Sequence, residues 1–104
     1  MQTQVTFRHL KSRTDFREEA TEAMNKFEKF SDTITSANVE FIAENLNIVE
    51  ITVHTNGKVL VVKDQSDDFM KSLHEAADKM NRQLRKQKEK HQKQKGIDLA
   101  SFIF

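Results

Sequence analysis

The sequence predicts an α+β domain in which two helices pack on one face of a four-stranded sheet. Three observations predict this class. Two segments repeat apolar residues at helical spacing, four segments alternate apolar and polar residues as strands do, and an Asn-Gly pair separates two of those strands. In chain order the elements read β-α-β-β-β-α, and 104 residues suffice for one domain with a single modest core.

The first strand is predicted where Val5 and Phe7 alternate with polar residues. A helix should begin near Thr14 and Asp15, because a hydroxyl or carboxylate there can cap free backbone amides. The apolar stripe of this helix steps by four, three, four and three residues and comprises Phe16, Ala20, Ala23, Phe27 and Phe30.

The central strands are predicted from Val39, Phe41 and Ala43 and from Val49, Ile51 and Val53. Asn56-Gly57 then predicts a two-residue hairpin, because both turn positions need positive φ. The hairpin sets Thr55 opposite Lys58 and places one set of residues on a single face: Val49, Ile51, Val53, Leu60 and Val62. The other face, with Thr52, His54, Val59 and Val61, is expected to stay open to solvent, because both helices can cover the first face.

Ser66, Asp67 and Asp68 can cap the last helix. Its apolar stripe comprises Phe69, Leu73, Ala76, Ala77, Met80 and Leu84 and stops there. A helix that continued from Arg85 to Lys95 would project about three turns beyond the body. Gly96 is expected to end it. The chain is therefore divided into a domain over residues 1–95 and an apolar tail over residues 96–104.

Basic residues are concentrated in the second half of that helix. Between Lys79 and Lys95 the chain has eight Lys/Arg and one acid, whereas residues 1–78 have nine Lys/Arg against fourteen Asp/Glu. At about 100° per residue, five of these residues lie within an arc of roughly 80° around the helix axis and form one basic stripe: Lys79, Arg82, Lys86, Lys90 and Lys93. Such segregation, in a chain whose net charge is only +1, makes nucleic acid the first candidate partner, and a solvated, lysine-rich helix end remains an equal alternative at this point.

Several function classes find no support in the residues. The chain has no cysteine, and its four histidines lie on different elements without ligand spacing, so no metal site is predicted. Neither a glycine-rich loop nor an activated nucleophile nor a convergent acid pair is present, so we expect no catalysis, cofactor or small-molecule substrate. No apolar run approaches the roughly 20 residues of a membrane span and no signal peptide is recognisable, so the expected location is the cytoplasm.

The stretch Asp78-Lys79-Met80-Asn81-Arg82-Gln83-Leu84-Arg85-Lys86-Gln87-Lys88-Glu89-Lys90 resembles the D-K-L-x-R-Q-L-R-K-x-K-E-K run of one bacterial family. This is the ribosome hibernation-promoting factor and ribosome-associated inhibitor (protein Y) family. Arg8-His9, Thr14–Glu18, Phe27–Phe30 and Val53–Gly57 resemble further motifs of the family. Phe7, Met70 and His74 depart from its pattern. The resemblance covers roughly residues 1–92.

The resemblance implies a fold similar in outline to a double-stranded-RNA-binding domain. It also implies binding to the small ribosomal subunit, with its 16S ribosomal RNA and decoding-region proteins as partners. Family members occupy the channel for messenger and transfer RNA and silence translation during starvation. Eight residues are expected to contact ribosomal RNA phosphates: Lys79, Arg82, Arg85, Lys86, Lys88 and Lys90 on the last helix, and Arg8 and Arg17 near the first.

Two other functions remain open. A protein-interaction module could use the basic helix, but its apolar stripe ends at Leu84 and leaves the most basic stretch without anchors. A general double-stranded-RNA binder usually clusters lysines at the start of its last helix, where this chain has Lys71 almost alone. The tail could dock on a partner, add a strand to a sheet edge or be inert. Its nine residues cannot encode the dimerisation domain of longer family members, so a short form is expected.

Overall fold

The computed structural model describes the backbone of residues 1–101 and the side chains of residues 1–87. Its elements follow the predicted order β-α-β-β-β-α, which confirms the α+β class. They are β1 (Gln2–Arg8), α1 (Thr14–Phe27), β2 (Ile34–Ala43), β3 (Asn47–Thr55), β4 (Lys58–Ser66) and α2 (Phe69–Ser101).

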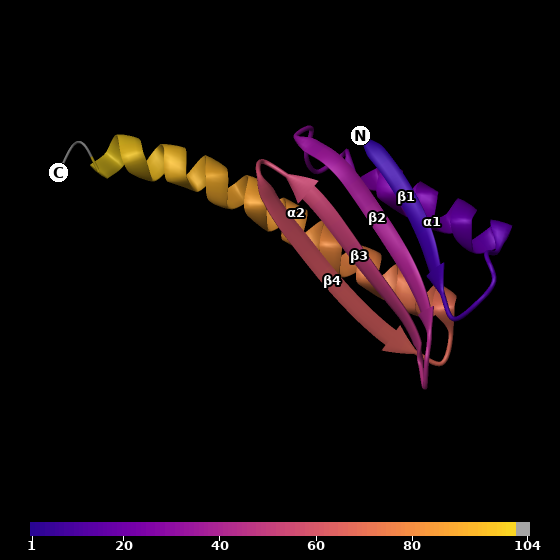
Figure 1. The fold of residues 1–104 in the computed structure, drawn as a ribbon. Helices are drawn as coiled ribbons and strands as arrows, with labels where there is room; N and C mark the ends of the chain where they lie inside the picture. Colours follow the sequence, from indigo (N-terminus) through magenta and orange to yellow (C-terminus); the bar gives the residue numbers. More distant parts are fainter. Residues whose placement is uncertain (102–104) are drawn as a thin grey trace.

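The four strands form one mixed sheet in the order β1-β2-β3-β4. β1 is parallel to β2, whereas the other two pairs are antiparallel. β1 and β4 are therefore the edge strands. Both helices lie on the same face of the sheet, and the second half of α2 extends beyond it (Figure 1). No helix in the described part of the chain combines the length and the apolar character that a membrane span needs.

The hairpin between β3 and β4 forms at the predicted residues. Asn56 and Gly57 have φ angles of 53° and 73°, and Thr55 pairs with Lys58. The open face is exposed at β4, where Val59 and Val61 keep 54% and 55% of their surface. This face is nevertheless not open to solvent everywhere, because Ile42 of β2 and its register partner Ile48 of β3 are buried there.

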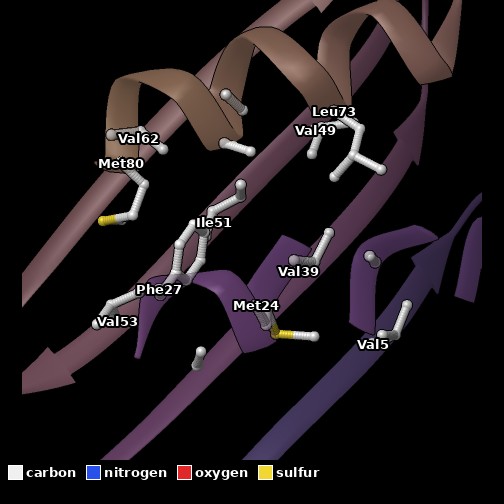
Figure 2. Close-up of a cluster of buried hydrophobic side chains, with 14 of the residues drawn as sticks. Val5, Met24, Phe27, Val39, Val49, Ile51, Val53, Val62, Leu73 and Met80 are labelled. Carbon is white, nitrogen blue, oxygen red and sulfur yellow. The ribbon is translucent and has the colours of Figure 1, made fainter. Parts of the chain in front are cut away.

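The core fills the space between the helices and the sheet, as Figure 2 shows for Met24, Phe27, Ile51 and Leu73. The predicted stripe of α1 was wrong in two places. Met24 is buried, whereas Ala23 and Phe30 only pack against the edge of the core. Inside the helix the buried residues step by four, four and three, which brings Met24 rather than Ala23 to the core. Phe30 lies beyond the end of the helix at Phe27, where the helical spacing no longer applies.

The N-termini of the two helices are capped differently. Asp68 caps α2, since its Oδ1 accepts a hydrogen bond of 3.1 Å from the Met70 N–H. At α1 the predicted cap was wrong: Arg13 occupies the N-cap position, and no side chain caps the helix. Asp15 instead accepts hydrogen bonds of 3.1 and 2.7 Å from the Arg13 guanidinium, which lowers the pKa of its carboxyl.

The whole predicted stripe of α2 is buried, from Phe69 to Leu84. The helix does not end at Gly96, as the sequence had suggested, but continues to Ser101. Glycine inside a helix costs only about 1 kcal/mol relative to alanine, so it weakens a helix without ending it. Strand addition by residues 97–101 is therefore wrong, because they are helical. Phe102–Phe104 lie outside the described residues, and docking of the tail stays a prediction.

One ion pair joins α2 to the edge strand β4. The Lys79 Nζ lies 2.9 Å from Oδ2 of Asp64, whose side chain is only 14% exposed. The hydrogen bond from Lys79 is the largest cause that lowers the pKa of Asp64, and the Gln65 N–H also donates to its Oδ1 at 2.8 Å. Burial of the Asp64 carboxyl raises its pKa, but this effect is smaller than the lowering by its hydrogen bonds, so the pKa remains below its usual value.

This pair predicts a pH-dependent contribution to stability. Because the pKa of Asp64 is lower in the folded than in the unfolded chain, its stabilisation is complete above the unfolded pKa of about 4 and is lost as the pH falls through the folded value. Asp64→Asn should therefore lower the free energy of unfolding by about 0.5–1 kcal/mol at pH 7, a small effect because Lys79 is half exposed.

Denaturant unfolding at pH 7, 4 and 2.5 would measure this effect, with the exposed Asp32→Asn as the matched control. The difference between the wild type and Asp64→Asn should shrink as the pH falls. A difference that stays constant over this range would contradict the assignment.

Candidate nucleic-acid interface

Three of the predicted residues lie together beside β4. Lys79, Arg82 and Lys86 line one side of a shallow groove of about 340 Å³, together with Gln83 of the same helix. Val62 and Lys63 of β4 line the other side. These six residues define what we call the α2–β4 groove. The positions in α2 fall on one face because they are spaced by three and four residues.

Two of the three predicted cations in this groove have acidic partners. Lys79 binds Asp64 as described above, and the Arg82 guanidinium pairs with the Asp78 carboxylate one turn earlier. That pairing raises the pKa of Arg82 above its usual value, so the guanidinium stays charged. Both side chains of the Arg82–Asp78 pair are largely exposed, and a phosphate can therefore compete for the arginine at little cost. Lys86 has no ion pair among the side chains of residues 1–87.

Arg85 lies on the flank of α2 that faces α1. Its guanidinium is placed over the Phe30 ring, 5.2 Å from the centroid. The structure therefore separates Arg85 from the α2–β4 groove, although both belong to the same basic stretch. The side chains of Lys88 and Lys90 lie outside the described residues.

Arg8 and Arg17 lie near the opposite edge of the sheet, at β1. Arg8 forms an ion pair of 3.7 Å with Glu40, and the Arg17 guanidinium lies over the Phe7 ring at 5.4 Å. Because β1 and β4 are separated by two strands, these arginines do not join the α2–β4 groove. Of the six predicted residues whose side chains are described, three line the groove, Arg85 lies apart, and Arg8 and Arg17 lie at the β1 edge, where we call them the β1 patch.

Sequence reasoning missed the aromatic stack that positions the β1 patch. Phe41 stacks between Phe7 and Phe16, with ring centroids 5.3 and 5.2 Å apart. Arg17 covers the Phe7 end of this stack, and Arg13 covers the Phe16 end at 4.0 Å. Arginines placed over aromatic rings keep their charge while losing little further conformational freedom on binding.

Lys63 and Gln83 are groove residues that the sequence did not single out. Lys63 belongs to β4, and only the strand order, which the residue pattern does not reveal, places that strand at the edge beside α2. Gln83 is uncharged, and the sequence analysis considered only basic residues on this helix. Among the side chains of residues 1–87, no three His, Asp or Glu groups converge as metal ligands.

Acidic residues mark the open face of the sheet as a different kind of surface. Glu40 of β2 lies directly opposite Glu50 of β3, and both are partly exposed. Two like charges at paired positions repel each other and also repel phosphate. Arg8 is the ion-pair partner of Glu40 and Lys63 is the register partner of Glu50, so the open face carries charges of both signs, whereas the residues that line the groove include no acid.

The sequence and the fold are both similar to those of known proteins. The chain is 32% identical over 91 residues to a protein of Azotobacter vinelandii named ribosome hibernation promoting factor, covering 86% of this chain and 85% of the relative. Its structure is similar to a ribosomal subunit interface protein of Coxiella burnetii, with a TM-score of 0.79, 23% identity and coverage of 86% of this chain and 99% of the other.

The fold also matches the N-terminal domain of Thermus thermophilus Protein Y, with a TM-score of 0.76, 18% identity and coverage of 83% of this chain and 98% of that one. Identities this low show the fold alone. The sequence profile of the family described as Sigma 54 modulation protein / S30EA ribosomal protein matches residues 3–92, nearly the whole folded body. The chain therefore belongs to the Sigma 54 modulation protein / S30EA ribosomal protein family.

Proposed function

We propose that this protein is a ribosome hibernation factor of the cytoplasm. It binds the small ribosomal subunit through the basic face of α2, occupies the channel for messenger and transfer RNA, and inhibits translation during stationary phase or stress. The observation that carries the proposal is the group of cations on one face of α2, at the point where the helix leaves the folded body. The name of the Azotobacter vinelandii relative supports the ribosome as the target.

The arrangement favours RNA phosphates over a protein groove as the partner of α2. A helix that docks in a protein groove needs exposed apolar anchors at helical spacing. Every residue of the apolar stripe, from Phe69 to Leu84, is instead buried against the sheet and α1. What α2 offers to a partner, within residues 69–87, is charge and hydrogen-bond donors. Such contacts position a protein on a nucleic acid without reading its sequence.

A structured RNA assembly accounts for two patches better than a short duplex does. The α2–β4 groove and the β1 patch lie on opposite edges of the sheet. A ligand that reaches both must surround the body, as the walls of a channel do. Arg8 and Arg17 would then contact one wall while Arg82 and Lys86 contact the other. Occupancy of the channel would exclude messenger and transfer RNA by steric overlap, without any chemical step.

The first prediction of this function concerns the charges of the groove. Arg82→Gln combined with Lys86→Gln should weaken binding to purified small subunits and reduce the slope of log K against log salt by about 1.4–1.8, since each phosphate contact contributes about 0.7–0.9. Lys79 is left intact because it also binds Asp64 and so contributes to stability. Binding titrations between about 0.05 and 0.2 M salt would measure the change.

The matched control is Lys26→Gln with Lys29→Gln, which removes the same charge from two exposed positions at and just beyond the end of α1. It should leave the slope nearly unchanged. If the two double variants lose affinity equally, net charge alone controls binding and the assignment of this face is wrong.

The second prediction concerns stoichiometry. In a purified translation system, inhibition should rise in proportion to the ratio of protein to ribosomes and reach its limit near one to one, because a steric block acts by occupancy. Excess initiator transfer RNA and messenger RNA should relieve it by competition. Strong inhibition at protein concentrations far below that of ribosomes would indicate a catalytic activity and refute the steric mechanism.

A further inference from the structure

The hairpin between β3 and β4 lies at the end of the sheet where α2 leaves the folded body (Figure 1). α2 runs along β4 in the direction opposite to the strand. Lys79 contacts Asp64 near the end of β4, and Lys86, about two turns later, lines the α2–β4 groove with Val62. Lys58, the first residue of β4, therefore lies beyond the groove, on the side toward which α2 projects.

Strand alternation places the Lys58 side chain on the face of the sheet that the helices cover. Its register partner is Thr55, which is only 5% exposed, and Leu60, two residues later on the same face, packs against the core. Lys58 itself is exposed, because it stands at the end of the strand. The other lysine of β4, Lys63, lies five residues later, so the same alternation places its side chain on the open face.

The charge of Lys58 is available to a ligand. Lys58 forms no ion pair with the side chains of residues 1–87. The sequence between Glu50 and Asp64 contains two lysines and one histidine but neither Asp nor Glu. Asp64, the acid that follows, is already paired with Lys79. No acid of the hairpin itself therefore opposes the approach of a phosphate to Lys58.

We propose that Lys58 is a further RNA-binding residue, which contacts a phosphate beyond the α2–β4 groove. This inference rests on the ribosome binding proposed above and extends the site from the helix to the hairpin. Lys58 lies four residues before Val62, about 13 Å along the strand. One small anion cannot span that length, whereas an RNA backbone carries negative charge all along it. The same strand of RNA could then contact Lys86 in the groove and Lys58 beyond it.

The hairpin also holds Lys58 in a defined position. Asn56 and Gly57 adopt the positive φ angles that fix the register of β4 against β3. The Thr55 hydroxyl oxygen lies 2.8 Å from that of Thr33, and this hydrogen bond ties the end of β3 to the residue before β2. A Cβ atom at Gly57 would meet nothing within 4 Å, so the tip of the hairpin leaves room for a nucleic-acid backbone. Phosphate contacts from fixed positions determine how a protein is oriented on its RNA.

The test is Lys58→Gln in the full chain, measured as binding to purified small ribosomal subunits at several salt concentrations. We expect affinity to fall about three- to tenfold at about 0.1 M salt and the salt slope to decrease by about 0.7–0.9, the effect of one lost phosphate contact. Lys58→Arg keeps the charge and should bind nearly as the wild type does. The matched control is Lys26→Gln, an exposed lysine of α1 whose ion pair with Glu22 is long, at 3.9 Å. Thermal unfolding should be unchanged in all three variants.

The outcomes separate this inference from the proposed function. If Lys58→Gln binds like the wild type while Arg82→Gln/Lys86→Gln is weakened, the hairpin contact is refuted and the proposed function stands. If Lys26→Gln loses as much affinity as Lys58→Gln, the effect is one of net charge and the inference is wrong. The inference is equally wrong if Lys58→Arg binds as weakly as Lys58→Gln. If the wild-type protein does not bind small subunits at all, the proposed function fails and the inference fails with it.

Discussion

Burial of the first half of α2 against the sheet is the constraint on which the rest of the structure depends. Phe69 begins this contact within 5.4 Å and 5.7 Å of the Phe16 and Phe41 rings, and Leu84 ends it. Forming the first turn of an isolated helix in water is unfavourable, because it fixes several residues for one hydrogen bond. Here the packed half supplies the nucleus, and the half beyond Leu84 needs only to continue it. This arrangement allows a highly basic helix to leave the body without a core of its own.

The acids of the domain reinforce that arrangement. Asp64 ties Lys79 to β4, and Asp78 holds Arg82 along the helix. These pairs limit the conformations of the cations before any ligand arrives, which lowers the entropic cost of binding. They also offset part of the positive charge of the groove, whereas Lys86 has no ion pair among the side chains of residues 1–87. Lys79 contributes to the fold through Asp64, in addition to its proposed role in binding.

Much of the fold could be predicted because local signals agreed with the tertiary structure. Asn56-Gly57 fixed one register, and the spacing from Phe69 to Leu84 identified the buried face of α2. The predictions of individual helix ends were wrong where the local preference of one residue was outweighed by other interactions. Gly96 weakens the helix but does not end it, and Asp15 binds Arg13 in place of capping α1.

The placement of the candidate site residues was predictable where they lie on one element. Lys79, Arg82 and Lys86 lie together because helical spacing alone determines their face. The separation of Arg8 and Arg17 from them, and the approach of Lys63, depend on the order of strands in the sheet. That order results from long-range packing, for which the residue pattern of a single strand gives no signal. The stack of Arg17 on Phe7 is likewise a contact between distant segments.

The measurement that tests the central claim most directly is an electron cryomicroscopy map of this protein bound to the small ribosomal subunit. The account predicts that the face of α2 with Arg82 and Lys86 lies against ribosomal RNA backbone, within the channel for messenger and transfer RNA. The open sheet face around Val59 and Val61 should contribute little to the contact. A complex in which that sheet face meets the RNA while α2 points away into solvent would contradict the account.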